Sequence, residues 1–495
     1  MGRVVVRSSR SVRLQSGTLL IVLLMWFVAG CAPAAAPPAA TTAPAKPTEA
    51  AKPTTAPAAA SPAAAASSPA AASASPATAA ASPAASPVAA APAAPKPAAA
   101  KPTGAPIKVG VLDDITGVGA IEGALMRVSV EMVVDQTNSS GGINGRPLDV
   151  MYVDPKGDAS QALQLATQLA ESDNVDVLSG GIFSPECLGV QGLAAKLQIV
   201  YVALNGCANE QFTTMSCNRY AFRVYPVGRQ VDEPVVAYMV KAFGPKWGII
   251  YPDYVLGQSN VASISAALKQ NGTDFVESAK IAVPLNEPNM TPYVSKIPTD
   301  GSIQVLQVSQ TGSDLARAMA VVQQFGINQK VKLSTTMGKE SFAGVYPDAM
   351  NGAIIRGARP SDGLPNSPDD AAFHAAWKAT ATRLADIVGP LGGPDKATPG
   401  NFNGYNAYAS MKALVLAMRA ANFTGKADTD KLIDAFESLK VPQGPDFPGG
   451  PFEMNKSDHQ GKFTQHLLQI NGQKEDVLAS IPPDQMPVLG TCQAK

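Results

Sequence analysis

VDVLSGGIFSPE, residues 175–186, has the pattern of an apolar strand, a tight loop and the start of a helix. Its two glycines allow the backbone to turn sharply. Ser184 is a favoured N-cap, Pro185 suits the first helical position, and Glu186 places negative charge in the first turn. The stretch predicts a helix N-terminus at the carboxyl end of a strand, where free backbone N–H groups and the Ser184 hydroxyl form a pocket for a small anion such as a carboxylate. An ordinary capped helix without a ligand is the alternative.

The charge balance of the chain argues against nucleic-acid binding. Among 495 residues, Lys plus Arg number 39 and Asp plus Glu number 39, so there is no basic excess to hold phosphates and no strongly acidic tail. We therefore expect partners among small molecules or proteins.

The N-terminus has the pattern of an export signal over residues 1–30. Arginines precede an apolar run from Leu19 to Val28, which is about ten residues long and shorter than the roughly twenty that a membrane-spanning helix needs. The small pair Ala29-Gly30 before Cys31 resembles a bacterial lipobox, in which the cysteine is lipidated. The resemblance implies an extracytoplasmic protein anchored to the bacterial membrane by a lipid on Cys31. A chance cysteine at a simple cleavage site is the alternative.

A low-complexity segment follows, and with Cys31 it makes a predicted tether over residues 31–106. Residues 32–106 are almost entirely Ala, Pro, Ser and Thr. Such a composition cannot bury a core, and the repeated prolines prevent a long helix. As a flexible coil the tether would span roughly 50 Å, so we expect the globular part to stand away from the membrane.

Once Cys31 is assigned to a lipid, an even set of cysteines remains. Cys207 and Cys217 are close in the sequence, and we predict a disulfide between them, worth about 3 kcal/mol on the chain-entropy model. Cys187 and Cys492 would form the second pair. Reduced structural thiols are the alternative, and no spacing suits a zinc site.

Short β-rich runs alternate with helical runs from Ile107 onward. The first series has predicted strands at residues 107–112, 148–153, 175–178 and 199–202. A second series has predicted strands at residues 247–251, 303–308 and 332–335 and a helix at 313–325. Later helices are expected at residues 369–388, 406–421 and 429–439, followed by a Gly/Pro-rich stretch and a short β-like tail. Repeated β-α-β units predict parallel sheets covered by helices, in two lobes with a ligand cleft between them.

Catalytic and cofactor motifs are lacking. The histidines, His374, His459 and His466, form no ligand spacing with Cys or carboxylates and lie near no nucleophile elbow. No phosphate-binding Gly-x4-Gly-Lys-Ser/Thr loop occurs. The run Gly117–Gly123, with Asp154 further on, is a near miss for a dinucleotide fingerprint. We therefore expect no enzyme activity, no cofactor and no metal.

Several motifs together carry a family resemblance. They are Thr116-Gly117, Asn138 with Gly141 to Pro147, Asp154 to Asp158 with Gln161-Ala162, the Gly180 to Ser184 loop, Phe222-Arg223, Tyr251 to Gly257, Met337 to Glu340, and Tyr405 to Ala407. From Ile107 to about Gly472 the chain resembles the type I periplasmic binding proteins of the leucine/isoleucine/valine family. The resemblance implies an α/β fold of two Rossmann-like lobes with parallel central sheets joined by three hinge crossovers. Lobe 1 would hold residues 107–227 and 358–445, and lobe 2 would hold 228–357 and 446–495.

The same resemblance implies a monomeric solute-binding protein that closes on a small amino-acid-like ligand and delivers it to an ABC permease. First-lobe residues would bind the ligand carboxylate, Glu340 would pair with its amino group, and Tyr254 would line the other side. A packing role for Tyr254 and a solvated Glu340 are the alternatives. The implied ligand-binding residues are Phe183, Ser184, Ala203, Asn205, Tyr254, Gln310, Thr311 and Glu340.

The sequence also departs from the family pattern. Pro185-Glu186 stand where relatives often have Ser or Thr, Asn205-Gly206 stand where many have small Ala or Thr, and an aromatic is absent around Gln310-Thr311. The pocket is therefore expected to be more polar than a leucine site, and a urea-like, amide or organic-acid ligand is as credible as an aliphatic amino acid. A ligand sensor of the same fold is the alternative to uptake.

Overall fold

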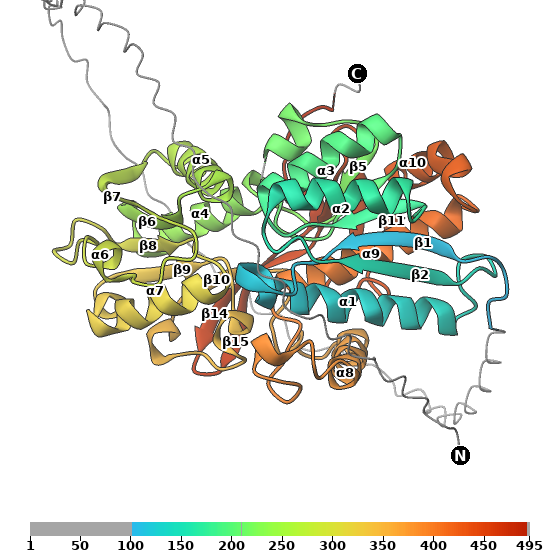
Figure 1. Ribbon diagram of the computed structural model, residues 1–495. Helices are drawn as coiled ribbons and strands as arrows, with labels where there is room; N and C mark the ends of the chain where they lie inside the picture. Colours follow the sequence, from blue (N-terminus) through green and yellow to red (C-terminus); the bar gives the residue numbers. More distant parts are fainter. Residues whose placement is uncertain (1–100, 209, 493–495) are drawn as a thin grey trace, which may run out of the picture. The chain divides into compact units, whose positions relative to one another are not determined.

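The computed structural model describes residues 101–208 and 210–492 (Figure 1). The expected signal peptide over residues 1–30 and the expected lipidation site Cys31 lie outside the described residues, as does most of the expected tether over 31–106. No helix in the described part of the chain is long and apolar enough to cross a membrane.

Lobe 1 is built on an eight-stranded sheet with the order β11-β12-β13-β5-β4-β3-β1-β2. Neighbouring strands from β13 through β5, β4, β3 and β1 to β2 are parallel. At the other edge, β12 is antiparallel to both β13 and β11. The strands are β1 (Ile107–Leu112), β2 (Leu148–Val153), β3 (Val177–Gly180), β4 (Tyr201–Ala203), β5 (Ala221–Arg223), β11 (Lys440–Val441), β12 (Phe452–Asn455) and β13 (Gln460–Phe463).

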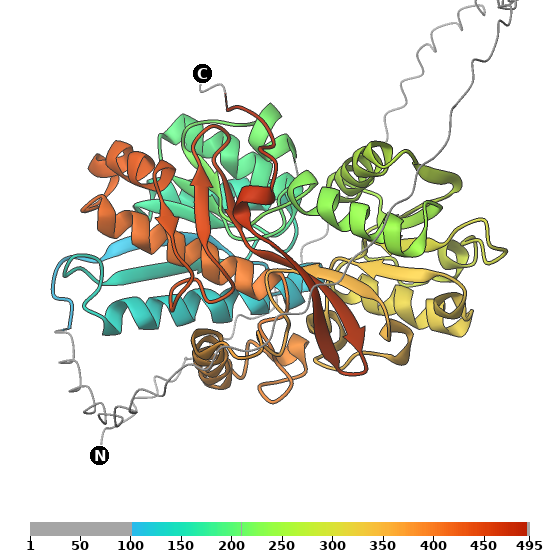
Figure 2. The same ribbon diagram turned by 180° about the vertical axis from the view of Figure 1, so that it is seen from behind.

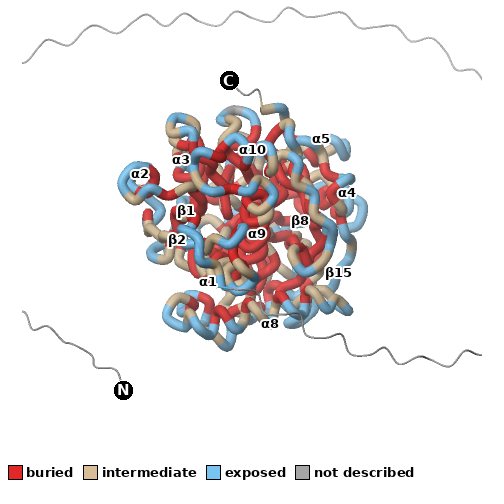
Figure 3. Tube along the Cα trace, turned by 90° about the vertical axis from the view of Figure 1, so that its right-hand side faces the viewer, coloured by how far each residue is buried: buried red, intermediate tan, exposed pale blue. Residues whose placement is uncertain are grey.

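Helices cover both faces of this sheet because its strands are apolar on both sides. Val109 and Val111 of β1 pack into a core with α1 (Ala120–Ser139), α8 (Pro368–Arg383), α9 (Asn403–Ala420) and α10 (Thr429–Glu437). On the other face, Leu178 and Tyr201 pack with α2 (Ala159–Glu171) and α3 (Ser184–Leu197). The buried core follows the sheet and α9 in Figure 3.

Lobe 2 repeats this design with a seven-stranded sheet of order β15-β14-β10-β9-β8-β6-β7. Helices α4 (Arg229–Phe243) and α5 (Val255–Gln270) cover one face, and α6 (Thr291–Val294) and α7 (Gly312–Gln324) cover the other. The strands are β6 (Trp247–Pro252), β7 (Phe275–Val283), β8 (Val305–Val308), β9 (Lys332–Thr335), β10 (Ile354–Gly357), β14 (Gln465–Asn471) and β15 (Lys474–Ile481). The expectation of parallel central sheets is confirmed for the centre of each lobe, and antiparallel hairpins complete the edges.

Three crossovers join the lobes, as the resemblance implied. The first runs from β5 to α4 and the second follows β10 at Gly357, close to the expected boundaries. The third passes through Thr464, between β13 of lobe 1 and β14 of lobe 2 (Figure 2), so the boundary expected between residues 445 and 446 is wrong. The Gly/Pro-rich stretch does not cross between lobes, because it returns the chain to the lobe 1 sheet as the β12–β13 hairpin.

The expected Cys207–Cys217 disulfide is not formed, and neither is a Cys187–Cys492 pair. Cys187 bonds Cys207 with a Cα–Cα separation of 5.7 Å, because the first turns of α3 and the loop after β4 lie at the ends of adjacent strands. Cys217 bonds Cys492 with a Cα–Cα separation of 5.3 Å. Proximity in sequence therefore misled the prediction, since both bonds depend on which strand ends and segments meet in the fold.

The segment after β15 runs back from lobe 2 to lobe 1. Leu489 packs in the lobe 1 core, and its backbone N–H donates to Asp458 Oδ2 at 3.0 Å. The Cys217–Cys492 disulfide fixes this segment to lobe 1 covalently. The lobes are thus linked by three crossovers of the main chain and by this returning C-terminal segment.

Candidate functional site

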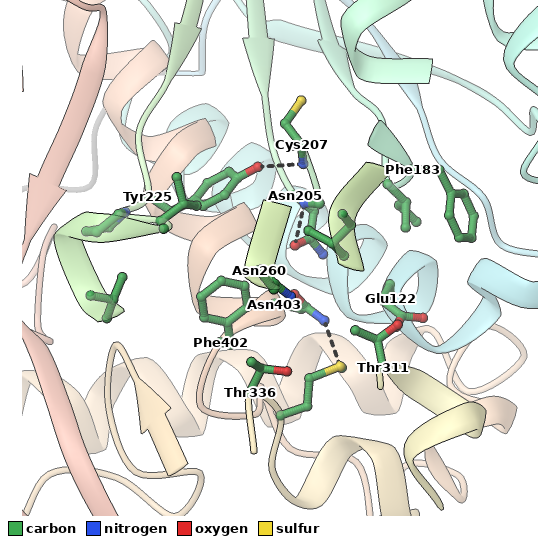
Figure 4. A pocket seen from close by; sticks show the side chains of 18 of the residues that line it. Glu122, Phe183, Asn205, Cys207, Tyr225, Asn260, Thr311, Thr336, Phe402 and Asn403 are labelled. Atoms are coloured by element: carbon green, nitrogen blue, oxygen red, sulfur yellow. Dashed lines mark hydrogen bonds between the residues drawn. The ribbon is translucent and has the colours of Figure 1, made fainter. Parts of the chain in front are cut away.

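A cleft between the lobes contains residues from both sheets' carboxyl ends and from the crossovers (Figure 4). It encloses about 740 Å³ of space free of protein atoms, part of it open to solvent. Its polar and aromatic lining residues are Glu122, Asn205, Asn260, Thr311, Thr336, Arg356, Asn403, Phe183, Tyr225, Tyr254 and Phe402.

The β3–α3 loop, which contains the stretch quoted first, reaches one wall of the cleft. Gly180 has φ +96°, and a Cβ there would lie 2.2 Å from the Leu112 carbonyl oxygen, so only glycine fits beside β1. Helix α3 begins at Ser184, so Phe183 rather than Ser184 is the N-cap residue. Ser184 is fully buried, and its hydroxyl donates to the Gly206 carbonyl at 3.3 Å instead of facing the cleft.

The pocket for a small anion that was expected in this loop is filled by a side chain of the protein itself. The Glu186 carboxylate accepts hydrogen bonds from the backbone N–H groups of Ile182 at 3.3 Å and Phe183 at 3.2 Å. Glu186 at the third helical position thus reaches back as in a capping box. Burial, and then the charge of Asp114, raise the pKa of Glu186. The sequence prediction missed this competition between a side chain and a ligand for the same donors.

The loop after β4 forms the adjacent wall. Gly206 has φ +65°, and a Cβ there would lie 1.5 Å from the Ile182 carbonyl oxygen, so the two loops are in close contact. Asn205 Oδ1 accepts the Gly206 N–H at 3.0 Å. Its Nδ2 is buried and has no hydrogen-bond partner in the described part of the chain. This amide is therefore a free donor beside the cleft.

Glu122 is the acidic residue of the cleft. It lies in the first turn of α1 in lobe 1, and a Cβ on Gly312 of lobe 2 would be 2.9 Å from its Oε1. Its Oε2 is buried without a hydrogen-bond partner among the described residues. Burial, followed by the charges of Asp314 and Asp114, raises the pKa of Glu122 to about 7.

Aromatic side chains from both lobes enclose the apolar part of the cleft. Phe183, Tyr225 and Phe402 come from lobe 1 and its connections, while Tyr254 precedes α5 in lobe 2 and packs against the lobe 1 core. The Tyr225 hydroxyl accepts the Cys207 N–H at 3.3 Å. Burial raises the pKa of Tyr225 to about 12, so this side chain stays neutral.

Arg356 of β10 also lines the cleft, but its charge is already paired. It forms an ion pair with Asp232 of α4, which in turn accepts the Ser263 hydroxyl at 2.6 Å. Arg356 and Asp232 have side-chain exposures of 13% and 1%, so the pair is largely shielded from water. Burial lowers the pKa of Arg356 to about 10, which leaves it charged at neutral pH.

The structure brings together half of the residues expected at the site. Phe183, Asn205, Tyr254 and Thr311 line the cleft. The other expected residues, Ser184, Ala203, Gln310 and Glu340, are buried and are not among those that line it.

Glu340, expected to pair with a ligand amino group, lies in the protein interior. Its Oε1 accepts the Gly338 N–H at 3.2 Å. Burial raises its pKa to about 7.

Sequence reasoning missed Glu122, Tyr225, Asn260, Phe402 and Asn403, all of which line the cleft. A usable signal existed for Glu122, since it lies in the first turn of the helix that follows β1, at the same sheet edge as the Phe183 loop. Within residues 101–208 and 210–492, no group of three or more His, Cys, Asp or Glu side chains could hold a metal ion.

Two α/β lobes, three crossovers and a lined cleft define a two-lobed ligand-binding protein. The chain belongs to the periplasmic binding protein family, whose model matches residues 106–475, and its fold is that of type I. This family implies an extracytoplasmic location.

Named relatives bind different solutes. The Leu/Ile/Val-binding protein homolog 8 of Brucella abortus is 23% identical over 74% of this chain and 88% of its own. An R. palustris ABC-transporter solute-binding protein in complex with benzoate superposes with a TM-score of 0.64 at 19% identity, covering 79% and 98% of the two chains. The Brucella ovis leucine-, isoleucine-, valine-, threonine- and alanine-binding protein in closed conformation gives 0.64 at 18%, covering 79% and 99%. At these identities the two structures establish the fold and leave the ligand open.

Proposed function

We propose that this protein is a non-enzymatic solute-binding component of an ABC importer that captures a small ligand between its lobes. The observation that carries the proposal is the cleft itself, whose lining includes Phe183 and Asn205 from lobe 1 and Tyr254 and Thr311 from lobe 2. A ligand that contacts both lobes stabilises the closed form by its differential affinity for that form. Closure is then the signal that the permease reads.

Membrane attachment through Cys31 is part of the same proposal. The sequence pattern around Ala29-Gly30-Cys31 and the low-complexity residues 32–106 support a lipid anchor followed by a tether. Replacing Cys31 with Ser should release the protein into the soluble fraction. Retention of the Cys31→Ser variant in washed membranes would contradict the anchor without affecting the binding proposal.

A ligand screen on the full chain tests the binding proposal. Thermal unfolding is followed with amino acids, amides and small carboxylates, and a ligand at 100 times its Kd adds about 2.7 kcal/mol to the free energy of unfolding. Phe402→Ala and Asn205→Leu should abolish the shift, because both side chains line the cleft. Val345→Ser, at an exposed apolar residue outside the lining, is the matched control and should keep it.

Uptake is the decisive readout for the importer. Cells that lack the gene should lose accumulation of the labelled ligand found in the screen, and the wild-type gene but not the Phe402→Ala gene should restore it. A ligand that binds the cleft while its uptake is unchanged by deletion would contradict the transport role.

A further inference from the structure

We propose that the cleft selects small amines or primary amides that present N–H donors to Glu122, attached to an apolar or aromatic body, and that it rejects free carboxylates. This inference rests on the proposed solute-binding function and deepens it by naming the ligand class. It follows from which polar groups of the cleft are free and which are already bound.

Glu122 is the first of these groups. It is 7% exposed, lines the cleft, and its Oε2 has no hydrogen-bond partner within the part of the chain that the structure describes. Glu122 also takes part in none of the ion pairs among residues 101–208 and 210–492. A buried carboxylate without a partner is costly, and an N–H donor from a ligand would satisfy it.

The charges around Glu122 point the same way. Asp314 and Asp114 act on it with negative charge, and Asp314 is itself bound to Arg317. Asp114 and Glu186 behind the β3–α3 loop also have raised pKa values, so this side of the cleft holds carboxyl groups that a nearby cation would favour in their ionised form. A cation bound there is stabilised as these groups ionise, whereas an anion would be stable only beside their protonated forms.

The described part of the cleft offers a ligand carboxylate no unpaired cation, and its buried donors without a partner there, Asn205 Nδ2 and Thr336 Oγ1, are neutral. Among the lining residues of the described chain, Arg356 is the one lysine or arginine, and Asp232 already pairs with it. The backbone N–H groups of Ile182 and Phe183 donate to Glu186. An entering carboxylate could gain a cationic partner or this pair of backbone donors only by breaking one of these buried arrangements, and removing one partner of a buried ion pair is strongly unfavourable.

The remaining lining fits the other parts of such a ligand. Asn205 Nδ2 is a buried donor without a partner in residues 101–208 and 210–492, so it matches a carbonyl oxygen such as that of a primary amide. The rings of Phe183, Tyr225, Tyr254 and Phe402 supply apolar surface, and an ammonium group near a ring face gains a cation–π attraction. Glu122 of lobe 1 and Thr311 of lobe 2 lie side by side in Figure 4, and Thr311 precedes Gly312, where a Cβ would be 2.9 Å from Glu122 Oε1.

Three probes that share a phenyl ring but differ in net charge test the proposal on the full chain. Benzylamine, benzamide and benzoate are titrated by calorimetry at one pH and salt concentration. We expect benzylamine or benzamide to bind and benzoate to bind at least about 10-fold more weakly, because each lost charge-assisted hydrogen bond costs a factor of about 10 to 100. The wild-type comparison depends on no variant, so a folding defect cannot obscure it.

Two isosteric variants locate the acceptor. Glu122→Gln should weaken benzylamine by about 10- to 100-fold and benzamide by less, since the amide carries no charge. Glu475→Gln removes another buried carboxyl whose pKa is raised in the same direction, and Glu475 does not line the cleft. It should leave the affinity for benzylamine within a factor of about 3.

Each contrary outcome overturns the proposal. Benzoate binding as tightly as benzylamine and benzamide does so. Loss of benzylamine binding in Glu475→Gln but not in Glu122→Gln does so as well. If none of the three probes binds, the amine and amide assignment also falls. Benzoate or an amino acid that binds and is lost in Phe402→Ala would leave the solute-binding function standing, whereas a chain that binds no solute in the wider screen would remove both.

Discussion

The carboxylate of Glu122 in lobe 1 lies so close to Gly312 in lobe 2 that a Cβ on Gly312 would be 2.9 Å from Glu122 Oε1. The two lobes therefore meet at a residue without a side chain, directly at the start of α7. This contact exists only while the cleft is closed to this degree.

Gly312→Ala should consequently hold the lobes apart and weaken ligand binding by about tenfold or more, since closure must then overcome a clash. The φ of +49° at Gly312 adds backbone strain of its own. Gly272→Ala is the matched control, because Gly272 has φ +74° and open space where the Cβ would go. Small-angle scattering should give a larger radius of gyration with ligand for Gly312→Ala only; equal radii for the two variants would contradict the contact.

Ionisation of Glu122 should contribute to the pH dependence of the free energy of unfolding. Its pKa is raised from 4.5 in an ordinary setting to about 7 in the folded protein. Between these values the unfolded chain loses the proton that the folded chain keeps, so the free energy of unfolding falls as pH rises and levels off above about 7. For this group the fall is about 3 kcal/mol. Urea unfolding at pH 5 and pH 8 should give a smaller difference for Glu122→Gln, whereas exposed Glu277→Gln should keep the wild-type difference.

Binding of an amine should release protons near neutral pH. A cation beside Glu122 favours the ionised carboxylate and so lowers its pKa from about 7. Calorimetric titration of benzylamine in two buffers of different ionisation enthalpy measures the number of protons released. Glu122→Gln should remove this release, and an unchanged proton count in that variant would exclude Glu122 as its source.

Glu186 should stabilise the β3–α3 loop through the N–H groups it accepts. Glu186→Ala leaves the buried donors of Ile182 and Phe183 without this acceptor and should cost about 1–3 kcal/mol. Glu186→Gln keeps a side-chain oxygen within reach and should cost less. Denaturant midpoints of the two variants at one pH check this order, and equal midpoints would contradict a stabilising role for the side-chain oxygen.

Peptide mapping under non-reducing conditions tests the disulfide pairing directly. Digestion without reduction should give peptides that link Cys187 to Cys207 and Cys217 to Cys492. On the chain-entropy model the second bond, with a sequence separation of 275, stabilises by about 5 kcal/mol and the first, with a separation of 20, by about 3. The double variants to Ala should follow that order in thermal unfolding, and a peptide linking Cys207 to Cys217 would contradict the structure.

Much of the fold could be predicted from hydrophobic periodicity, because buried strands and amphipathic helices each have a characteristic spacing of apolar residues. The bounds of β1, β2 and β9 agree with the sequence prediction residue for residue. Strand β7 was missed because it lies at a sheet edge and alternates exposed residues such as Glu277 with buried ones. Strand β10 was missed because it has only four residues, although the turn signal Asn351-Gly352 stands just before it.

The candidate site was predicted less fully for a different reason. The loop that contains Phe183 could be placed at the cleft by the rule that ligands bind at strand carboxyl ends, whereas Asn205 was expected there from the family resemblance. The role of Glu186 depends on a hydrogen bond within its own loop, and the position of Glu122 depends on contact with lobe 2. Neither is encoded in a local pattern, since each is set by how distant or competing groups meet after folding.

The returning C-terminal segment changes how the molecule would respond to tension. The described chain enters lobe 1 through β1, and the Cys217–Cys492 bond brings its other end back to lobe 1. Lobe 2 is thus an insertion within lobe 1, in the topological sense. A pull applied at either end of the described chain would load lobe 1 alone, so lobe 2 could swing over the cleft without working against whatever holds the protein in place.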